Sequence, residues 1–168
     1  MARLSPKDCA HRIYRDTRFK KDKTPLKTYF SATFTTRGRT VSRAGYYLQM
    51  GIGEDMGIFG GIWCPDSKLL KRLRSDIVAS PEEFRSTFEN KRVLEAFPDW
   101  VGTKLKTVPK GYDRNDPNAD LLRLVDIGRF HPADETFFCS PDWPEKTAEL
   151  MSLLKPLCDF INFTIDEG

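Results

Sequence analysis

Hydrophobic and polar residues alternate in three short segments near the start of the chain, and such alternation is typical of half-buried β-strands. The segments are residues 29–35, 45–50 and 58–63. Residues 11–16 suggest a further short strand before them. Because short polar or glycine-rich connections join the three segments, we expect them to pair as an antiparallel meander.

The connection between the second and third of these segments is rich in glycine. Gly51, Gly53 and Gly57 surround the pair Glu54–Asp55, and glycine readily adopts the positive φ angles that tight turns need. We therefore predict a hairpin here. The same glycines do not form a dinucleotide-binding fingerprint, because their spacing differs and because they lie between strands instead of before a helix.

From about residue 66 onward the hydrophobic period changes from two to about 3.6, which is the period of amphipathic helices. Four helices are predicted, and they begin near Asp66, Ser80, Pro117 and Trp143. Asp66 is a typical N-cap, and residues 80–83 have the pattern of a capping box with proline at the first helical position. Pro156 lies inside the last helical pattern and should kink or split that helix.

Two further short strands are predicted among the helices, at residues 104–108 and 127–131. Strands thus come first and helices mostly follow, an order that favours the α+β class. We predict a single domain over residues 1–168, with an antiparallel sheet of three to five strands packed by three or four helices. A domain of this length buries enough surface to fold without disulfides or metals.

The composition excludes several classes of protein. No apolar run approaches the ~20 residues of a membrane helix, and the start of the chain lacks the apolar core of a secretory signal. The four cysteines are not closely paired as in structural zinc sites, so we expect reduced thiols, no metal and no cofactor. These cysteines are Cys9, Cys64, Cys139 and Cys158. We predict a cytoplasmic protein with no membrane partner, and a nuclear location stays open.

The net charge of +3 conceals an asymmetry between the two parts of the chain. Residues 1–50 contain 12 Lys and Arg but only 3 Asp and Glu, whereas residues 51–168 contain 15 and 21. Much of the positive charge lies in one block, residues 15–27, which contains only two acidic residues. The cations are Arg15, Arg18, Lys20, Lys21, Lys23 and Lys27, and the anions are Asp16 and Asp22.

This basic block has one leading interpretation. Arginine binds phosphate with two parallel hydrogen bonds and lysine adds a point charge, so we predict a site for a phosphorylated small molecule. The predicted ligand-binding residues are Arg15, Arg18, Lys23 and Lys27, with Tyr47 and Trp63 as aromatic neighbours. Nucleic acid is a second anionic partner, ranked lower because the rest of the chain is acidic.

Two alternatives stay open. In the first, the protein is a hydrolase or transferase, and Asp16 or Asp22 acts as the base at the same site. In the second, the block is an internal ion-pair network of Arg15, Asp16, Arg18 and Asp22, and the protein is a structural or interaction module. No established nucleophile, metalloprotease or phosphate-loop motif occurs in the sequence to decide between them.

Residues 12–28 also resemble the signature R-D-x-R-F-x-x-D-K-x-P-x-K-T of a widespread family of conserved hypothetical proteins in bacteria and fungi, a domain of unknown function. Later blocks are similar to the family as well, and they lie at residues 45–48, 60–65, 109–113 and 117–122. The resemblance implies a fold but no reaction.

Members of this family usually begin with a helical segment before the signature, whereas this chain starts only eleven residues before Arg12. The resemblance therefore implies a truncated or shortened member. We expect the surface left uncovered to bind a protein partner or a second copy of the chain.

Overall fold

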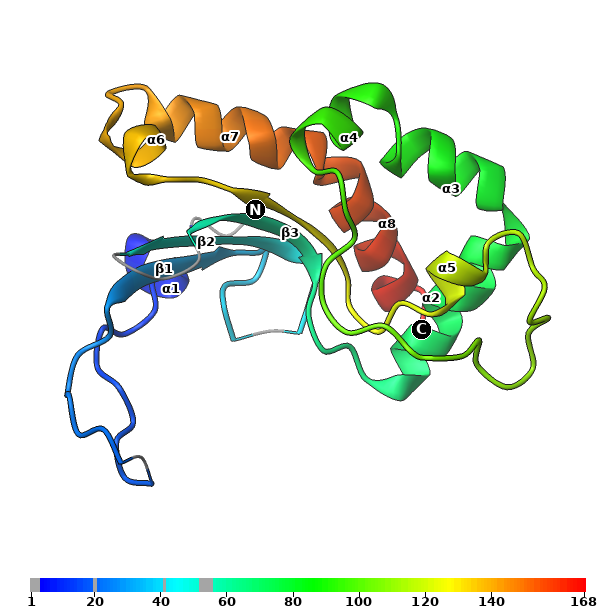
Figure 1. The fold of residues 1–168 in the computed structure, drawn as a ribbon, viewed down its shortest axis with the longest axis horizontal. Helices are drawn as coiled ribbons and strands as arrows, with labels where there is room; N and C mark the ends of the chain where they lie inside the picture. The colour runs from blue at the N-terminus through cyan, green and yellow to red at the C-terminus, as the bar shows by residue number, and fades with distance from the viewer. Residues whose placement is uncertain (1–3, 20, 41, 52–55) are drawn as a thin grey trace.

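The computed structural model describes residues 4–19, 21–40, 42–51 and 56–168, which form an antiparallel sheet with helices on one face (Figure 1). The strands are β1 (Tyr29–Phe34), β2 (Gly45–Gly51), β3 (Gly57–Ile62) and β4 (Ile127–Pro132), and they lie in that order across the sheet. The predicted α+β class and the meander are therefore confirmed. The predicted hairpin around Glu54–Asp55 lies outside the described residues.

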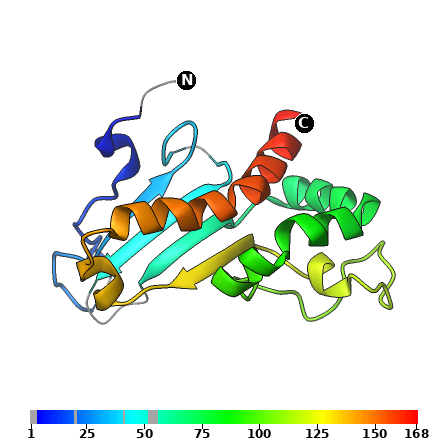
Figure 2. The same cartoon turned by 90° about the horizontal axis from the view of Figure 1, so that it is seen from above.

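Helices follow and interrupt the strands. Within the described residues they are α1 (Pro6–Cys9), α2 (Ser67–Ala79), α3 (Pro81–Phe88), α4 (Lys91–Ala96), α5 (Ala119–Leu122), α6 (Glu135–Cys139), α7 (Trp143–Leu153) and α8 (Lys155–Asp166). Both α7 and α8 contact β3 and lie across the same face of the sheet (Figure 2). Among the helices described, none has the length and apolar character that a membrane span requires.

The helix boundaries confirm two of the sequence signals and correct a third. The Asp66 carboxylate accepts a hydrogen bond from the backbone N–H of Leu69 at 2.8 Å, as an N-cap should. Pro156 falls in the first turn of α8, and it separates α8 from α7. The predicted capping box at Ser80 is wrong, because the Ser80 side chain makes no cap hydrogen bond. Ser80 is both the C-cap residue of α2 and the N-cap residue of α3.

Two predicted strands, residues 11–16 and 104–108, do not form as strands in the described structure. Each makes one isolated bridge instead, Tyr14 with Leu26 and Lys104 with Leu124. The first segment pairs with a neighbouring segment that turns away from the sheet, and the second pairs with the irregular chain after α5. Neither partner is long enough to extend a ladder.

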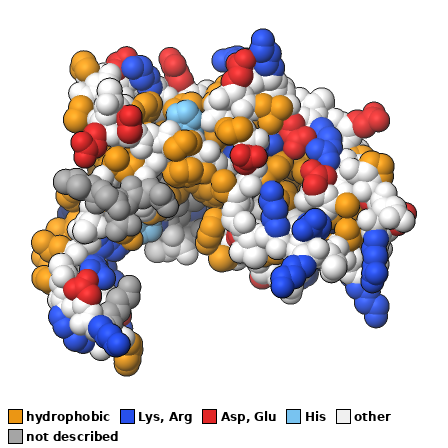
Figure 3. All heavy atoms as spheres, in the orientation of Figure 1, with side chains coloured by type: hydrophobic (Ala, Val, Ile, Leu, Met, Phe, Trp, Pro, Cys, Tyr) orange, Lys and Arg blue, Asp and Glu red, His pale blue; other side chains and the backbone are white. Residues whose placement is uncertain are grey.

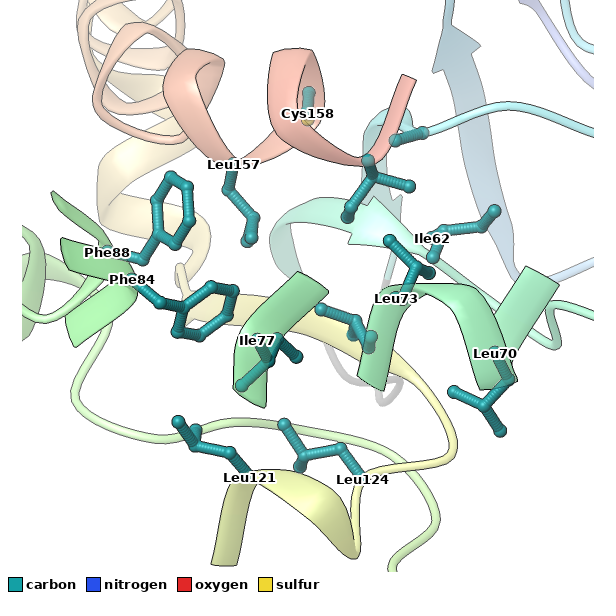
Figure 4. Close-up of a cluster of buried hydrophobic side chains, with 13 residues drawn as sticks. Ile62, Leu70, Leu73, Ile77, Phe84, Phe88, Leu121, Leu124, Leu157 and Cys158 are labelled. Carbon is teal, nitrogen blue, oxygen red and sulfur yellow. The ribbon is translucent and has the colours of Figure 1, made fainter. Parts of the chain in front are cut away.

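The main hydrophobic core lies on the helix side of the sheet (Figure 4). Helices α2, α3, α5 and α8 contribute most of its side chains, together with the end of β3. Leu73, Ile77, Leu157 and Ile161 are almost completely buried there. The apolar stripes predicted for α2 and α8 therefore pack against each other.

The register of the strands separates their side chains into two faces. Leu48 and Ile58 are cross-strand partners that are buried on the helix side. Because successive side chains in a strand point to opposite faces, their neighbours Tyr47 and Phe59 point away from α7 and α8. Among the described elements, helices α2 to α8 leave this second face uncovered, and we call it the open face; α1 contacts only the edge strand β1 among the strands.

Candidate functional site

The open face is hollowed into a groove with a volume of about 670 Å³. Two rows of residues cross the sheet here. The aromatic row consists of Tyr47 on β2, Phe59 on β3 and Phe130 on β4, which are successive cross-strand partners. The glycine row beside it consists of Gly45, Gly61 and Gly128, also successive partners. A row of rings thus borders a strip of sheet without side chains.

Two further rings extend the aromatic row at its sides. The imidazole of His11 meets the Tyr47 ring edge to face, with centroids 6.0 Å apart. The indole of Trp63 meets the Phe59 ring in the same manner at 5.9 Å. All five aromatic side chains line the groove, which therefore offers several ring faces and edges to a ligand.

Glycine is required at two positions of the glycine row. A Cβ atom on Gly128 would lie 2.3 Å from Cζ of Phe59, so the Phe59 ring occupies the space above this residue. Gly61 has a φ of +138°, and a Cβ atom there would lie 2.2 Å from the carbonyl oxygen of Ile127. Side chains at these positions would displace the ring or the strand, so the glycines shape the groove.

A buried carboxylate holds the wall that carries Trp63. Asp126 is 1% exposed, and its two oxygens accept hydrogen bonds from the backbone N–H groups of Cys64 at 2.8 Å and Thr103 at 2.7 Å. These bonds join the turn after β3 to residues 101–103, and Val101 and Gly102 also line the groove. Trp63 therefore stays over the groove although its side chain is 58% exposed.

Polar side chains line the β1 side of the groove. His11 Nε2 lies 2.8 Å from the Thr33 hydroxyl, and the Tyr47 hydroxyl donates to Gln49 Oε1 at 2.7 Å. Burial lowers the pKa of His11, and the charges of Lys27 and Arg39 lower it further. A neutral imidazole is thus favoured at pH 7, with one nitrogen as a donor and the other as an acceptor.

The charged side chains of the described groove lining are cationic. Arg39 and Arg43 line it, and no Asp or Glu does among the residues described. The guanidinium of Arg43 donates two hydrogen bonds to Asp166, at 2.6 and 2.7 Å, which neutralises its charge. Arg39 donates to the backbone carbonyl of Lys7 and forms no ion pair among the described residues. The lining therefore favours an anion over a cation.

The predicted site residues lie in two different places. Tyr47 and Trp63 line the groove, as a shared site would require. The four predicted cations Arg15, Arg18, Lys23 and Lys27 do not line it, because they lie on a projection that we call the arm, residues 12–19 and 21–28. The arm doubles back on itself, with Arg15 N–H donating to Pro25 O at 2.9 Å and Lys27 N–H to Ile13 O at 2.8 Å.

The two aspartates of the arm pair with arginines of the arm. Asp16 receives a forked pair of hydrogen bonds from Arg18, the shortest at 2.7 Å, and Asp22 lies 2.5 Å from Arg15. The hydroxyl and N–H of Thr24, followed by Arg15, lower the pKa of Asp22 to about 2. These contacts have the geometry of an internal ion-pair network. Neither carboxylate lines the groove, so the groove gains no acid–base group from the arm.

The sequence interpretation missed His11, Phe59 and Phe130 as groove residues. Phe59 and Phe130 do occur at alternating positions of predicted strands. If Tyr47 is paired with Phe59 across the predicted hairpin, Phe59 is expected on the same face as Tyr47, because cross-strand partners share a face. His11 had no comparable signal, since the segment before β1 was expected to form a regular strand.

The comparisons with known proteins identify a family. No curated protein matches the chain, and no solved structure matches it. Within the described ranges, no group of three or more His, Cys, Asp or Glu side chains could hold a metal ion. The model of a conserved hypothetical protein family, DUF2461, matches residues 1–160, in agreement with the family resemblance. The chain therefore belongs to the DUF2461 family of conserved hypothetical proteins.

Proposed function

We propose that the groove of the open face binds a phosphorylated small molecule that carries a planar ring, of the nucleotide class. One observation carries this proposal, namely the aromatic row beside the glycine row in a groove whose described lining contains cations and no carboxylate. A planar ring fits over Gly45 and Gly61, the part of the glycine row that lines the groove, where it contacts the neighbouring aromatic rings.

The polar groups of the lining suit the remainder of such a ligand. The Arg39 guanidinium is available to a phosphate group, which it can bind with parallel hydrogen bonds. Thr33, Gln49 and neutral His11 offer both donors and acceptors to a sugar or to the edge of a base. The proposed anion site therefore lies in the groove, and the arm contributes to it only through the nearby charge of Lys27.

The four thiols are free, and Cys64 and Cys139 are exposed. Exposed free thiols are compatible with a reducing compartment, so the proposed ligand belongs to the cytoplasmic pool of nucleotides.

A thermal-shift titration tests the proposal with three probes, adenosine 5′-monophosphate, adenosine and inorganic phosphate. We expect the nucleotide at a hundred times its Kd to raise the Tm by roughly 5–10 °C, because a ligand of the native state stabilises it by mass action. Adenosine and phosphate should each bind more weakly than the nucleotide, since each carries only one of the two groups that the groove is proposed to bind, the ring or the phosphate. Equal shifts with all three probes, or no shift at millimolar nucleotide in low salt, would contradict it.

A further inference from the structure

The arm is a projection of fixed shape on the open side of the sheet. It descends from the β1 end on the side opposite α7 and α8 (Figure 1), and a hollow separates its far end from the body (Figure 3). The two backbone hydrogen bonds described above join the two segments of the arm where it leaves the sheet. Farther out, Lys23 Nζ donates to the Thr17 carbonyl at 2.9 Å, and the Thr24 N–H donates to Asp22 at 2.9 Å. Together with the Arg15–Asp22 and Arg18–Asp16 pairs, these bonds hold the turn of the arm together.

The arm carries much more positive than negative charge. Its sequence contains seven Lys and Arg between Arg12 and Lys27, of which Lys20 lies outside the described residues, and only two Asp. Both aspartates are engaged by Arg15 and Arg18. The remaining cations in the described part of the arm make no ion pair. These cations are Arg12, Lys21, Lys23 and Lys27. Their charge is available to an anionic partner.

Exposed aromatic side chains accompany these cations. Phe19 at the turn of the arm is 96% exposed, and Tyr14 is also largely exposed. The Arg18 guanidinium lies 6.0 Å from the Phe19 ring centroid, and Lys27 Nζ lies 5.2 Å from the Tyr29 ring centroid. Cations that alternate with open ring faces are the usual surface for single-stranded nucleic acid, whose bases stack on rings and whose phosphates meet the cations.

The arm and the groove adjoin at Lys27, whose charge acts on His11 in the groove. In an extended chain four residues span roughly 13 Å, which is the order of separation between Lys27 and Lys23. One small phosphorylated ligand held in the groove does not reach the cations at the turn of the arm. A ligand with several phosphates in a row reaches both.

We propose that the nucleotide held in the groove is one unit of a single-stranded nucleic acid, with bases on the aromatic row and Trp63 and with its backbone continuing from the groove along the cations of the arm. This inference rests on the proposed function and names its ligand class. A single strand is required because the rings lie inside a groove, where only an unpaired base can enter. An anionic membrane would engage the arm but leave the rings of the groove unused.

The test measures fluorescence anisotropy of a labelled twelve-nucleotide single strand at several salt concentrations. The arm variant Arg12→Gln, Lys21→Gln, Lys23→Gln removes three cations without touching the groove. Its matched control is Lys68→Gln, Lys71→Gln, Lys110→Gln, which removes three exposed cations elsewhere. We expect the arm variant to bind the oligonucleotide on the order of tenfold more weakly in low salt, and to lower the salt slope by about 2. The control should bind like the wild type.

Adenosine 5′-monophosphate separates the two proposals in the same assay series. The arm variant should bind this mononucleotide as the wild type does, because the substituted cations do not line the groove. Mononucleotide binding without oligonucleotide binding would overturn the single-strand proposal and leave the proposed function standing. Equal oligonucleotide affinity of arm variant and control, tighter binding of a duplex, or arm-dependent binding of phosphatidylserine vesicles in place of the oligonucleotide would also overturn it. If the wild type does not bind the mononucleotide, both the proposed function and the single-strand proposal are overturned.

Discussion

Replacing Arg129 by leucine is expected to lower the free energy of unfolding by about 3 kcal/mol. Arg129 is 1% exposed on β4, and its Nη1 donates to the carbonyl oxygen of Phe97 at 2.7 Å. Its guanidinium lies 4.1 Å from the ring centroid of Trp100, and Nη2 lies 3.4 Å from Glu89. Leucine would leave the buried carbonyl without a donor and would remove the cation from the ring and the carboxylate.

The cost of removing the Arg129 charge from water limits how much free energy of unfolding the leucine variant can lose. Burial lowers the pKa of the guanidinium, which means that the native state tolerates the charge at a cost. The hydrogen bond to Phe97 and the stacking on Trp100 offset that cost, and they hold residues 97–100 against β4. The same segment continues into Val101 and Gly102 of the groove, so the variant should also weaken any ligand of the groove.

Urea denaturation of Arg129→Leu and of Arg12→Leu provides the measurement. Arg12 is exposed on the arm, so its replacement is expected to change the free energy of unfolding by less than about 0.5 kcal/mol. A loss below about 1 kcal/mol for Arg129→Leu would mean that the buried guanidinium contributes little, and the structural role assigned to it would be wrong.

The double variant Tyr47→Ala, Trp63→Ala is expected to weaken nucleotide binding about 100-fold. Removal of one ring that stacks on a base costs about 1–3 kcal/mol. Tyr47 is the cross-strand partner of Phe59, and Trp63 meets the Phe59 ring edge to face. Both are partly exposed, so the fold should persist without them. Calorimetric titration with adenosine 5′-monophosphate measures the change.

Phe30→Ala is the matched control for this variant. Phe30 lies on the same sheet but on the helix face, as the partner of Met50, and it is 64% exposed. Its loss should leave nucleotide affinity within about twofold of the wild type, because it does not line the groove. If the double variant binds as tightly as the control, the aromatic row does not hold the ligand.

Much of the fold followed from hydrophobic spacing. The alternation of residues 29–35 and 45–50 predicted β1 and β2 because their helix-face positions are apolar, including Leu48. The 3.6 period located α2 and α8 because both contribute a buried stripe to one core. The shorter helices α4 and α6 escaped prediction, since helices of five or six residues carry too few turns for a period to be visible. The four-residue α5 was indicated by Pro117 just before it.

The candidate site was predicted only in part, because it depends on distant contacts. Tyr47 and Trp63 stood out as aromatic residues near glycines, and both line the groove. Phe130 joins them through the pairing of β3 with β4, strands that are separated in the chain by the four helices α2 to α5. The charge pattern of residues 15–27 located the cations, but nothing in it indicated that they form an arm outside the groove.

The central claim is that the open face binds a nucleotide, and a heteronuclear NMR titration with adenosine 5′-monophosphate tests it most directly. We predict that the resonances that shift belong to the aromatic and glycine rows, with Phe59, Phe130 and Gly61 among them. Residues of the helix face such as Ile58 should stay unchanged. Shifts confined to the helix face or to the arm, or none at millimolar nucleotide, would contradict the account.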